Sequence, residues 1–383
     1  MTALERIRTA MNFGTPDRVP VMCQFSIGHM LLQLGVSPAD FWCDAGVYVE
    51  SLFRMRAMYD FDGILVSLHG HDPAWRSRVV SRRETAEGEV LVWVDGSRTV
   101  FPRDELPRHI PCGGMQASPP GEHGEEEATS LLEYIPVSQG LRFAIHPVHR
   151  FDALEQVVQR SAGRYSVHGE VTSPFDYVLD HYGHQAVLLA LLDDPSSVKR
   201  ALATFTGRIV TLAKAMCLTG VDAIKISSPY AGAGFISPGC YAEFVLPYER
   251  ELVQVIKERG VKAYLHTCGA IRDRLELMIA SGADGIECLD PPPLGNMELS
   301  DALRVIGGRC FVKGNVDSVN SLLRGTPADI QADLRQRLEA ATGFPGFILS
   351  TACSIAPRVP REHVMLLRDA VETVGRGQQG HDA

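Results

Sequence analysis

A short apolar run followed by a longer segment with helical periodicity recurs along this chain, and no other feature limits its fold as strongly. The eight runs expected to be strands are Val19–Phe25, Gly63–Leu68, Arg164–Glu170, Asp222–Ser227, Lys262–Thr267, Gly285–Leu289, Cys310–Asn315 and Gly346–Thr351. Several are apolar along nearly their whole length, which is typical of strands covered on both faces. Eight strand–helix units predict an α/β fold, and specifically a (β/α)8 TIM barrel.

Two segments after the second predicted strand interrupt this repeat. Arg76–Pro102 alternates polar and apolar side chains around two acidic-Gly turn dipeptides, which predicts an inserted pair of β-hairpins. Cys112–Thr129 is rich in Gly, Pro and Glu, which predicts a flexible surface loop. We therefore expect one barrel domain over residues 1–375, an insertion at about 76–130, and a disordered tail at 376–383.

Composition argues against several classes of protein. The 383 residues are 45% hydrophobic and 22% charged, which is typical of a globular protein with ample material for a core. A net charge of -9 argues against a nucleic-acid-binding surface. We find no apolar run long enough to span a membrane and no apolar stretch of a signal peptide. Nine cysteines without a disulfide framework then predict reduced thiols and a cytoplasmic location.

The strongest chemical signal is a set of metal-ligand side chains at predicted strand ends. His266 and Cys268 follow the fifth strand, and Cys353 follows the eighth. In a barrel of this kind the active site lies at the C-terminal ends of the strands, so these residues should face the same opening. One imidazole and two thiolates are typical ligands of zinc. Glu287 is our first choice for the fourth ligand, and Asp290 is the second.

A structural role is the alternative for each of these residues. A His-x-Cys pair is a weak signal by itself, and buried free cysteines behave as small hydrophobic side chains. We expect Cys288 to be such a core residue, because it should point to the opposite side of its strand from Glu287. The location of all three candidate ligands at predicted strand ends favours the metal site.

Other side chains that carry chemistry also lie in or after predicted strands. They are His69, His71 and Asp72 after the second strand, His168 and Glu170 in the third, Tyr230 after the fourth, and Asn315 and Asp317 after the seventh. Our catalytic candidates are Glu287, Tyr230 and His69. The two histidines after the second strand could bind a substrate or a second metal, or could simply hydrogen-bond loops. Tyr230 could contact a ligand, or could serve capping or packing.

Several longer phrases occur in an order that is familiar. They are ERIRTAMNFGTPDRVPV, ISPGCYAEFVLPYERELVQVIKERG, LHTCG, GADGIE, KGNVDS…LLRGTP and APRVPREHV. Through these phrases the chain resembles the uroporphyrinogen decarboxylase superfamily over nearly its full length. The resemblance implies a (β/α)8 barrel, in agreement with the eight predicted strands.

Three departures separate the chain from the true decarboxylases of that superfamily. Those enzymes have an Arg-containing stretch after the first strand, where this chain reads CQFSIGHMLLQLG without Arg. They have a Ser-Asp pair after the second strand, where this chain has Ser67-Leu68. They have a His near the C-terminus where this chain has Cys353. The carboxylates of a tetrapyrrole would therefore lack their cationic partners.

The pattern of His266, Cys268 and Cys353 is instead similar to the zinc methyltransferases of the superfamily. The resemblance implies transfer of a methyl group between a corrinoid (cobalamin) and a thiol or another small methyl donor or acceptor. The cobalamin-independent methionine synthases are similar in using His, Cys, Glu and Cys, which supports Glu287 as a ligand. Our candidates for contacts with the cofactor are His168, Asn315 and Asp317.

The expected partners follow from the same resemblance. Corrinoid-binding domains commonly contain Asp-x-His-x-x-Gly, which this chain lacks, so the corrinoid should come on a separate protein or be free. A homodimer is compatible with the sequence, and neither a nucleic acid nor a membrane is expected as a partner. Two alternatives stay open: a decarboxylase-like lyase that acts on a different acid, and a non-catalytic barrel that binds a corrinoid or tetrapyrrole.

Overall fold

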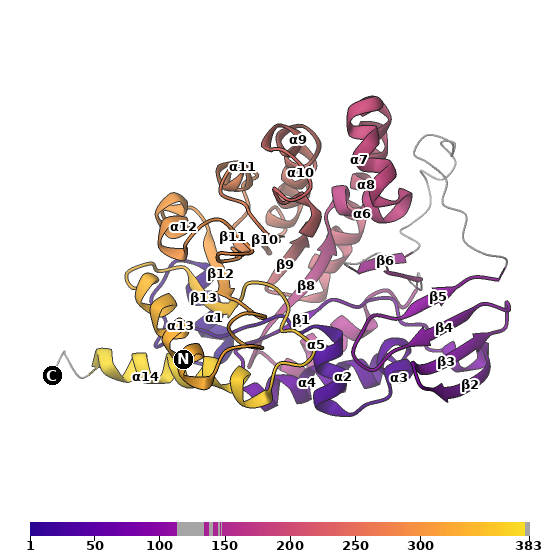
Figure 1. The fold of residues 1–383 in the computed structure, drawn as a ribbon, viewed down its shortest axis with the longest axis horizontal. Coiled ribbons are helices and arrows are strands. Elements are labelled where there is room, and N and C mark those ends of the chain that lie inside the picture. The colour runs from indigo at the N-terminus through magenta and orange to yellow at the C-terminus, as the bar shows by residue number, and fades with distance from the viewer. Residues whose placement is uncertain (113–133, 138–140, 145, 147, 380–383) are drawn as a thin grey trace.

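The architecture centres on a parallel β-sheet that curls within a layer of helices (Figure 1). The computed structural model describes residues 1–112, 134–137, 141–144, 146 and 148–379. The strands of this sheet pair in sequence order and are β1 (Gly63–Val66), β8 (Ser166–Thr172), β9 (Ala223–Ser227), β10 (Lys262–Thr267), β11 (Gly285–Cys288), β12 (Phe311–Val316) and β13 (Phe347–Thr351). The α/β class and seven of the eight predicted strands are confirmed.

The first predicted strand, Val19–Phe25, is reduced to two isolated bridges at Val21 and Phe25. Pro20 has no N–H to donate to a ladder. The Val21 N–H donates to the side chain of Asp62 (2.8 Å) rather than to a neighbouring strand. The Asp62 N–H donates to the Val21 carbonyl (2.8 Å), and Val21 bridges β13, so the segment lies between β13 and the start of β1.

Helices occupy most of the chain between the strands. They are α1 (Ala3–Met11), α2 (Ile27–Leu34), α3 (Pro38–Cys43), α4 (Ala45–Tyr59), α5 (Asp152–Ser161), α6 (Pro174–Tyr182), α7 (His184–Asp193), α8 (Pro195–Met216), α9 (Pro238–Phe244), α10 (Leu246–Lys257), α11 (Leu275–Ala280), α12 (Leu299–Ile306), α13 (Pro327–Ala340) and α14 (Arg361–Gln379). The segment from 238 to 257 is divided into α9 and α10, because Pro247 has no N–H to donate within a continuous helix.

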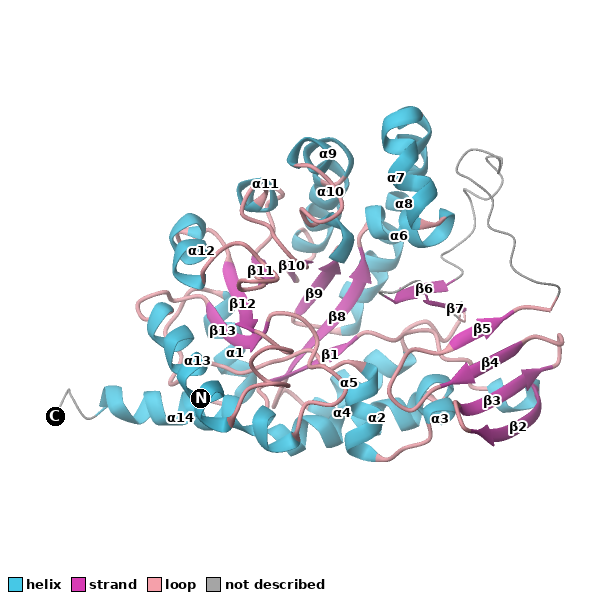
Figure 2. Ribbon diagram, viewed as in Figure 1, coloured by secondary structure: helices cyan, strands magenta, loops and turns pink. Residues whose placement is uncertain are grey.

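A separate four-stranded antiparallel sheet lies between β1 and β8 in the sequence (Figure 2). Its strands pair in the order β2 (Val79–Thr85), β3 (Gly88–Trp93), β4 (Arg98–Phe101) and β5 (Arg108–Ile110). Arg82 on β2 forms an ion pair with Asp40 on α3 (3.0 Å), which ties this sheet to the helical layer. A two-stranded sheet follows, made of β6 (Tyr134–Val137) and β7 (Leu141–Ala144). Residues 113–129 of the expected surface loop lie outside the described residues.

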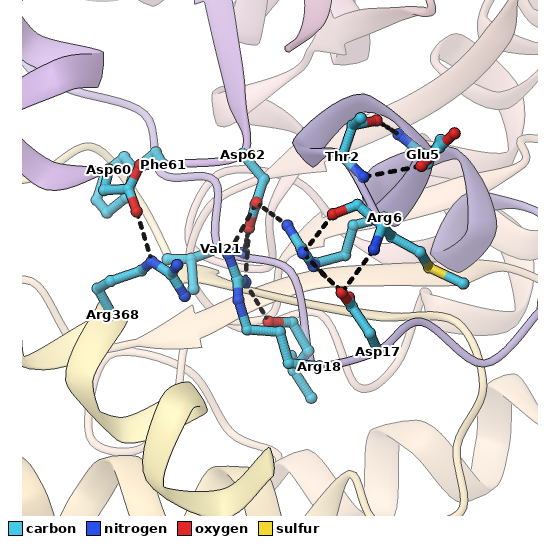
Figure 3. Close-up of polar contacts among 12 residues, drawn as sticks. Thr2, Glu5, Arg6, Asp17, Arg18, Val21, Asp60, Phe61, Asp62 and Arg368 are labelled. Atoms are coloured by element: carbon cyan, nitrogen blue, oxygen red, sulfur yellow. Dashed lines mark hydrogen bonds and ion pairs between the residues drawn. The ribbon is translucent and has the colours of Figure 1, made fainter. Parts of the chain in front are cut away.

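The N-terminal segment closes the end of the sheet where the strands begin. Ile7 and Met11 of α1 pack against Tyr264 and Phe311 from inside the sheet. Asp62, just before β1, is held by the guanidinium groups of Arg6 (2.7 Å) and Arg18 (2.8 Å), as Figure 3 shows. All three side chains are at most 10% exposed. This buried cluster joins α1, the first chain segment and β1.

Helix α8 is long and apolar. Pro195–Thr219, which is α8 and the turn after it, is the one helix among the described residues with the length and apolar character of a membrane span. It packs on α6, α7 and α10, and 39% of its apolar window is buried.

Residues 376–379 of the expected tail continue α14, while 380–383 lie outside the described residues.

Candidate functional site

Strand register brings a row of charged side chains together inside the curled sheet. Glu170 on β8 is opposite Lys225 on β9. His266 on β10 is opposite Glu287 on β11, which in turn is opposite Lys313 on β12. Alternate residues of a strand face the same side, so these five side chains share the interior face. The parallel sheet therefore encloses a polar layer above its apolar base.

His266, Cys268 and Cys353 converge above this layer. The Nε2 atom of His266 lies 3.3 Å from the Cys268 sulfur, and the two sulfurs of Cys268 and Cys353 are 3.8 Å apart. The three ligand atoms all lie within 4.8 Å of one another. The structure thus brings these three residues together, although Cys353 follows Cys268 by 85 residues. The donors and their spacing fit a soft divalent metal such as zinc.

Glu287 lies on the other side of the imidazole from the two thiols. Its Oε2 atom is 2.8 Å from Nδ1 of His266, while Nε2 of the same ring faces Cys268. The opposite oxygen, Oε1, accepts a hydrogen bond from Lys313, and Lys225 is 3.4 Å from Oε2. We had expected Glu287 to be the fourth ligand. The structure does not bring it into the group of possible ligands. A carboxylate in this place fixes the ring orientation and tautomer of a metal-binding histidine.

Cys288 is fully buried, as expected of a core residue, and its sulfur also lies beside the candidate ligands. Its sulfur lies 3.2 Å from Oδ2 of Asp290, and Cys268, Cys288 and Asp290 form a second group with ligand spacing. Cys288 and Leu289 have positive φ angles of 88° and 54°, so the side-chain alternation of a strand ends there. Asp290, our second choice as fourth ligand, is thus beside Cys268, and it also accepts a hydrogen bond from the Gly269 N–H (2.6 Å).

The electrostatics of the site favour ionised groups in spite of burial. Hydrogen bonds with Cys288 and Cys353 lower the pKa of the Cys268 thiol to about 5. Burial opposes ionisation of Glu287, but Lys313 and Lys225 outweigh it and hold the pKa of that carboxyl well below its usual range. Burial similarly opposes the charge of Lys225, but the neighbouring Glu170 and Glu287 raise its pKa.

Lys225 and Lys313 were not among the candidate residues from the sequence. Both are fully buried, and each contacts Glu287. Lys225 also pairs with Glu170 (3.1 Å) and hydrogen-bonds Gln24. A signal was available, because each lysine directly follows apolar residues inside a predicted strand, in AIKIS and in FVKGNV. A buried lysine needs an anionic partner, so its place in a strand pattern points to a polar interior.

A cavity of ≈600 Å³ opens above the thiol cluster. Cys353, Tyr230 and Asp176 are among its lining residues, together with residues 104–107 between β4 and β5 and the first residue of β5, Arg108. Tyr230 is half-buried, and its ring packs edge-on against His184 (4.3 Å). Tyr230 and Cys353 therefore line the same cavity, and the segment between β4 and β5 contributes another part of its wall.

The three residues expected to contact a cofactor do not line this cavity. His168 is fully buried near the start of β8, where it hydrogen-bonds Ser166 (3.1 Å) and the Tyr264 hydroxyl (3.1 Å). Asn315 donates to the Leu289 carbonyl (2.8 Å) and accepts from Arg337 (2.7 Å).

Asp317 accepts hydrogen bonds from the N–H groups of Val319 and Asn320 (both 2.8 Å). All three residues predicted to bind a cofactor therefore stabilise the scaffold. The prediction erred on His168 because β8 extends two residues past Glu170, so His168 lies deep in the sheet and not at its end.

His69 lies apart from the thiol cluster as well. It is 4% exposed, and its Nε2 atom donates to the carbonyl of Glu170 (3.2 Å). Burial lowers the pKa of His69 to about 4, so the ring is neutral at physiological pH. His69 lines a second cavity, distinct from the one that Cys353 lines. The structure thus does not place His69 among the groups that surround the candidate metal ligands.

Comparisons with known proteins agree with this architecture. Residues 144–374, which are more than half of the chain, match the family described as Uroporphyrinogen decarboxylase (URO-D). The chain is 31% identical over 155 residues to the methylcobamide:CoM methyltransferase MtbA of Methanosarcina mazei, a match that covers 39% of this chain and 42% of that relative. It is 26% identical over 217 residues to the uroporphyrinogen decarboxylase of Syntrophotalea carbinolica, covering 55% and 60% of the two chains.

A solved structure shares the fold across almost the whole chain. The structure of a methyltransferase from Methanosarcina mazei superimposes with a TM-score of 0.73 at 19% sequence identity. The superposition covers 98% of this chain and 99% of that one. The sequence matches to the curated relatives, in contrast, span about half of their length. The fold and the family match lead to one conclusion: the chain belongs to the uroporphyrinogen decarboxylase (URO-D) family.

Proposed function

We propose that the protein is a zinc-dependent methyltransferase that moves a methyl group between a corrinoid and a thiol or another small methyl donor or acceptor. The observation that carries this proposal is the convergence of Nε2 of His266 with the sulfurs of Cys268 and Cys353. The printed names of several relatives, methylcobamide:CoM methyltransferases, support the same chemistry. The absence of arginine after the first predicted strand argues against binding of a polycarboxylate tetrapyrrole.

The residues of the cluster fit zinc through donor chemistry and through support of the ligands. His266 offers Nε2 with its ring held by Glu287, and the thiols of Cys268 and Cys353 offer two soft donors. Asp290 and Cys288 stand next to Cys268 as sources of a displaceable fourth ligand. When bound, zinc would lower the pKa of a substrate thiol and hold its thiolate as a nucleophile.

The chain itself contributes position and charge to such a transfer. The cavity of ≈600 Å³ beside Cys353 holds a small substrate, and Tyr230 on its wall is our candidate for direct contact. The two buried lysines keep Glu287 ionised, so it accepts the Nδ1 proton of His266 and leaves Nε2 free to act as a ligand. Methyl transfer is an in-line displacement, to which a protein contributes mainly by positioning the reactants.

We extend the proposal to the organisation of the whole protein. Residues 1–375 form one domain in which segment 20–25 completes a (β/α)8 barrel, and 76–130 is an insertion. The corrinoid is supplied by a separate protein that docks at the cavity, or as a free cofactor. The protein works in the cytoplasm, with no nucleic-acid or membrane partner, and a homodimer is compatible with it.

Metal content and methyl transfer test this function together. Protein purified without a His tag or added metal is analysed for zinc beside Cys268→Ala, Cys353→Ala and the control Cys240→Ala, whose thiol lies on α9. We expect about one zinc per chain in the wild type and the control, and none in the two site variants. The same four proteins are assayed for methyl transfer from methylcobalamin to coenzyme M, followed by corrinoid absorbance.

Three results would contradict the proposal. Retention of a full equivalent of zinc by Cys353→Ala would show that the metal is held elsewhere. A well-folded wild type that gains no zinc on re-addition, and that releases carbon dioxide from a carboxylated substrate, would favour the decarboxylase-like alternative. A corrinoid spectral shift without turnover or zinc would favour a carrier.

A further inference from the structure

A second cavity, of ≈340 Å³, lies between the four-stranded β2–β5 sheet, α3 and the loop that follows β1. Figure 1 shows the β2–β5 sheet beside α3, at the opposite side of the molecule from β12 and β13. Trp42, Trp75, Trp93 and Phe101 line the cavity. These include all three tryptophans of the chain. Its volume and aromatic walls are those of a small-molecule site, for which roughly 300–1,000 Å³ is usual.

Two histidines on the wall of this cavity have unused hydrogen-bonding atoms. A carbonyl oxygen can only accept, so the Nε2 atom of His69 must carry the proton that bonds the Glu170 carbonyl. The Nδ1 atom of His69 is then an acceptor, and it is buried without a partner among the described residues. Both ring nitrogens of His71 and the indole nitrogen of Trp75 are also buried without a hydrogen-bond partner among the described residues.

Unpaired polar atoms of this kind are unusual in a folded interior. Most buried side-chain polar atoms have a hydrogen-bond partner, because an unsatisfied one costs about 1–3 kcal/mol. Four such atoms on three residues around one hollow point to a molecule that is absent from the structure. Burial also lowers the pKa of both His69 and His71 to about 4, so the two rings are neutral hydrogen-bonding groups.

The charged groups of the cavity are already paired with protein atoms. Asp72 accepts from the Ala74 N–H (2.8 Å) and lies 3.4 Å from Arg78. Asp95 accepts from both the N–H and the hydroxyl of Ser97 (2.9 and 2.6 Å). Arg78 and Asp95 are exposed to solvent, which screens their charges, whereas the buried histidines of the lining, His69 and His71, are neutral.

We propose that this cavity is a binding site for a small, uncharged aromatic molecule that carries a hydrogen-bond donor, such as a phenol. The ring packs among the indoles and Phe101, and the donor reaches the free Nδ1 of His69. Thr99 accepts a hydrogen bond from the indole nitrogen of Trp93 (2.9 Å) and contacts His109 (2.9 Å). These contacts hold the part of the cavity wall that the β2–β5 sheet provides. The site does not depend on methyl transfer, since none of the candidate zinc ligands lines the cavity.

The tryptophans provide a direct readout, because each one lines this cavity. Quenching of intrinsic fluorescence is titrated on the wild-type protein with four probes: phenol, anisole, benzoate and benzyltrimethylammonium. We expect saturable quenching by phenol with an affinity about tenfold higher than for anisole, which has the same ring without the donor. Both charged probes should bind more weakly than phenol. Equal affinity for phenol and anisole, tightest binding of a charged probe, or quenching without saturation would each overturn the proposal.

A variant locates the contact. His69→Phe should reduce the affinity for phenol to that for anisole and leave the anisole affinity unchanged. The control His363→Phe, on α14, should change neither. A His69→Phe protein that folds, by circular dichroism, and still prefers phenol by the wild-type ratio would contradict the assignment of His69. The comparison of the four probes on the wild type remains decisive if that variant does not fold.

Discussion

At the scale of single residues, Glu287 connects the fold with the proposed chemistry. Its carboxylate is 2% exposed, yet it contacts two ammonium groups and the imidazole of His266. A buried carboxylate without such partners would take up a proton. Here Lys313 and Lys225 keep it charged, so it serves as a fixed acceptor behind the candidate metal ligand.

Replacement of Glu287 by Gln tests this positioning role. The amide keeps the size of the side chain but removes the charge, so His266 loses its anionic partner and two lysines lose theirs. We expect zinc affinity to fall by about 10- to 100-fold, as is usual for partners of metal ligands. Competition with a chelator measures the change. Glu276→Gln, an exposed partner of Arg309, is the control and should bind zinc like the wild type.

Asp176 gives a second residue-scale prediction, on pH. Burial raises the pKa of its carboxyl to about 8, so the folded state binds a proton that the unfolded state releases above about pH 4. The stability contributed by this group is complete below the unfolded pKa and is lost as the pH rises toward 8. Asp176→Asn does not titrate, so it should gain stability relative to the wild type by about 1.4 kcal/mol per pH unit across that window.

Urea denaturation at several pH values in that window measures the difference between the two proteins. Asp301→Asn is the control: a hydrogen bond from Arg304 lowers the pKa of Asp301, so its effect falls below the window. A pH-independent difference between Asp176→Asn and the wild type would show that the buried carboxyl is ionised throughout.

At the scale of elements, the cluster around Asp62 explains how segment 20–25, which has little ladder pairing, is held beside the main sheet. Arg6 comes from α1, Arg18 from the chain before the bridges, and Asp62 directly precedes β1 (Figure 3). The carboxylate also accepts from the Val21 N–H. Segment 20–25 is thus held in place mainly by side-chain contacts, whereas the strands of the main sheet are held by backbone pairing.

Asp62→Asn should therefore be strongly destabilising. It removes the buried anion that Arg6 and Arg18 share and leaves them only the more exposed Asp17 and Glu372 as partners. Breaking a buried ion pair in this way costs about 3–5 kcal/mol. Urea denaturation followed by circular dichroism measures the loss. Asp60→Asn removes exposed ion pairs with Arg56 and Arg368 and should cost about 1 kcal/mol or less. Similar losses in both variants would rule out the special role of Asp62.

At the scale of the whole molecule, the proposed metal links the middle strand of the main sheet, β10, to the segment after its last strand, β13. His266 and Cys268 belong to β10 and the turn after it, and Cys353 follows β13. Zinc bound to all three would favour the folded state by mass action, by about 4 kcal/mol at a thousandfold excess over its dissociation constant. Removal of zinc with a chelator should lower the thermal midpoint, and Cys353→Ser should show no response to either zinc or chelator.

The sequence by itself determined the elements and the donor set of this protein. Apolar runs and helical periods are local properties, so seven parallel strands and the strand-end positions of His266, Cys268 and Cys353 could be predicted. The strand expected at Val19–Phe25 does not form a ladder, because Pro20 has no N–H and the Val21 N–H donates to Asp62, neither of which a pattern of apolar residues reveals.

Only the tertiary structure decided which side chains meet. The positive φ angles at Cys288 and Leu289 turn a presumed core thiol toward Cys268. Register between strands places Glu287 behind the imidazole and beside Lys225 and Lys313. These relations depend on backbone geometry and on contacts between segments far apart in the chain. The periodicity of the sequence does not reveal such contacts.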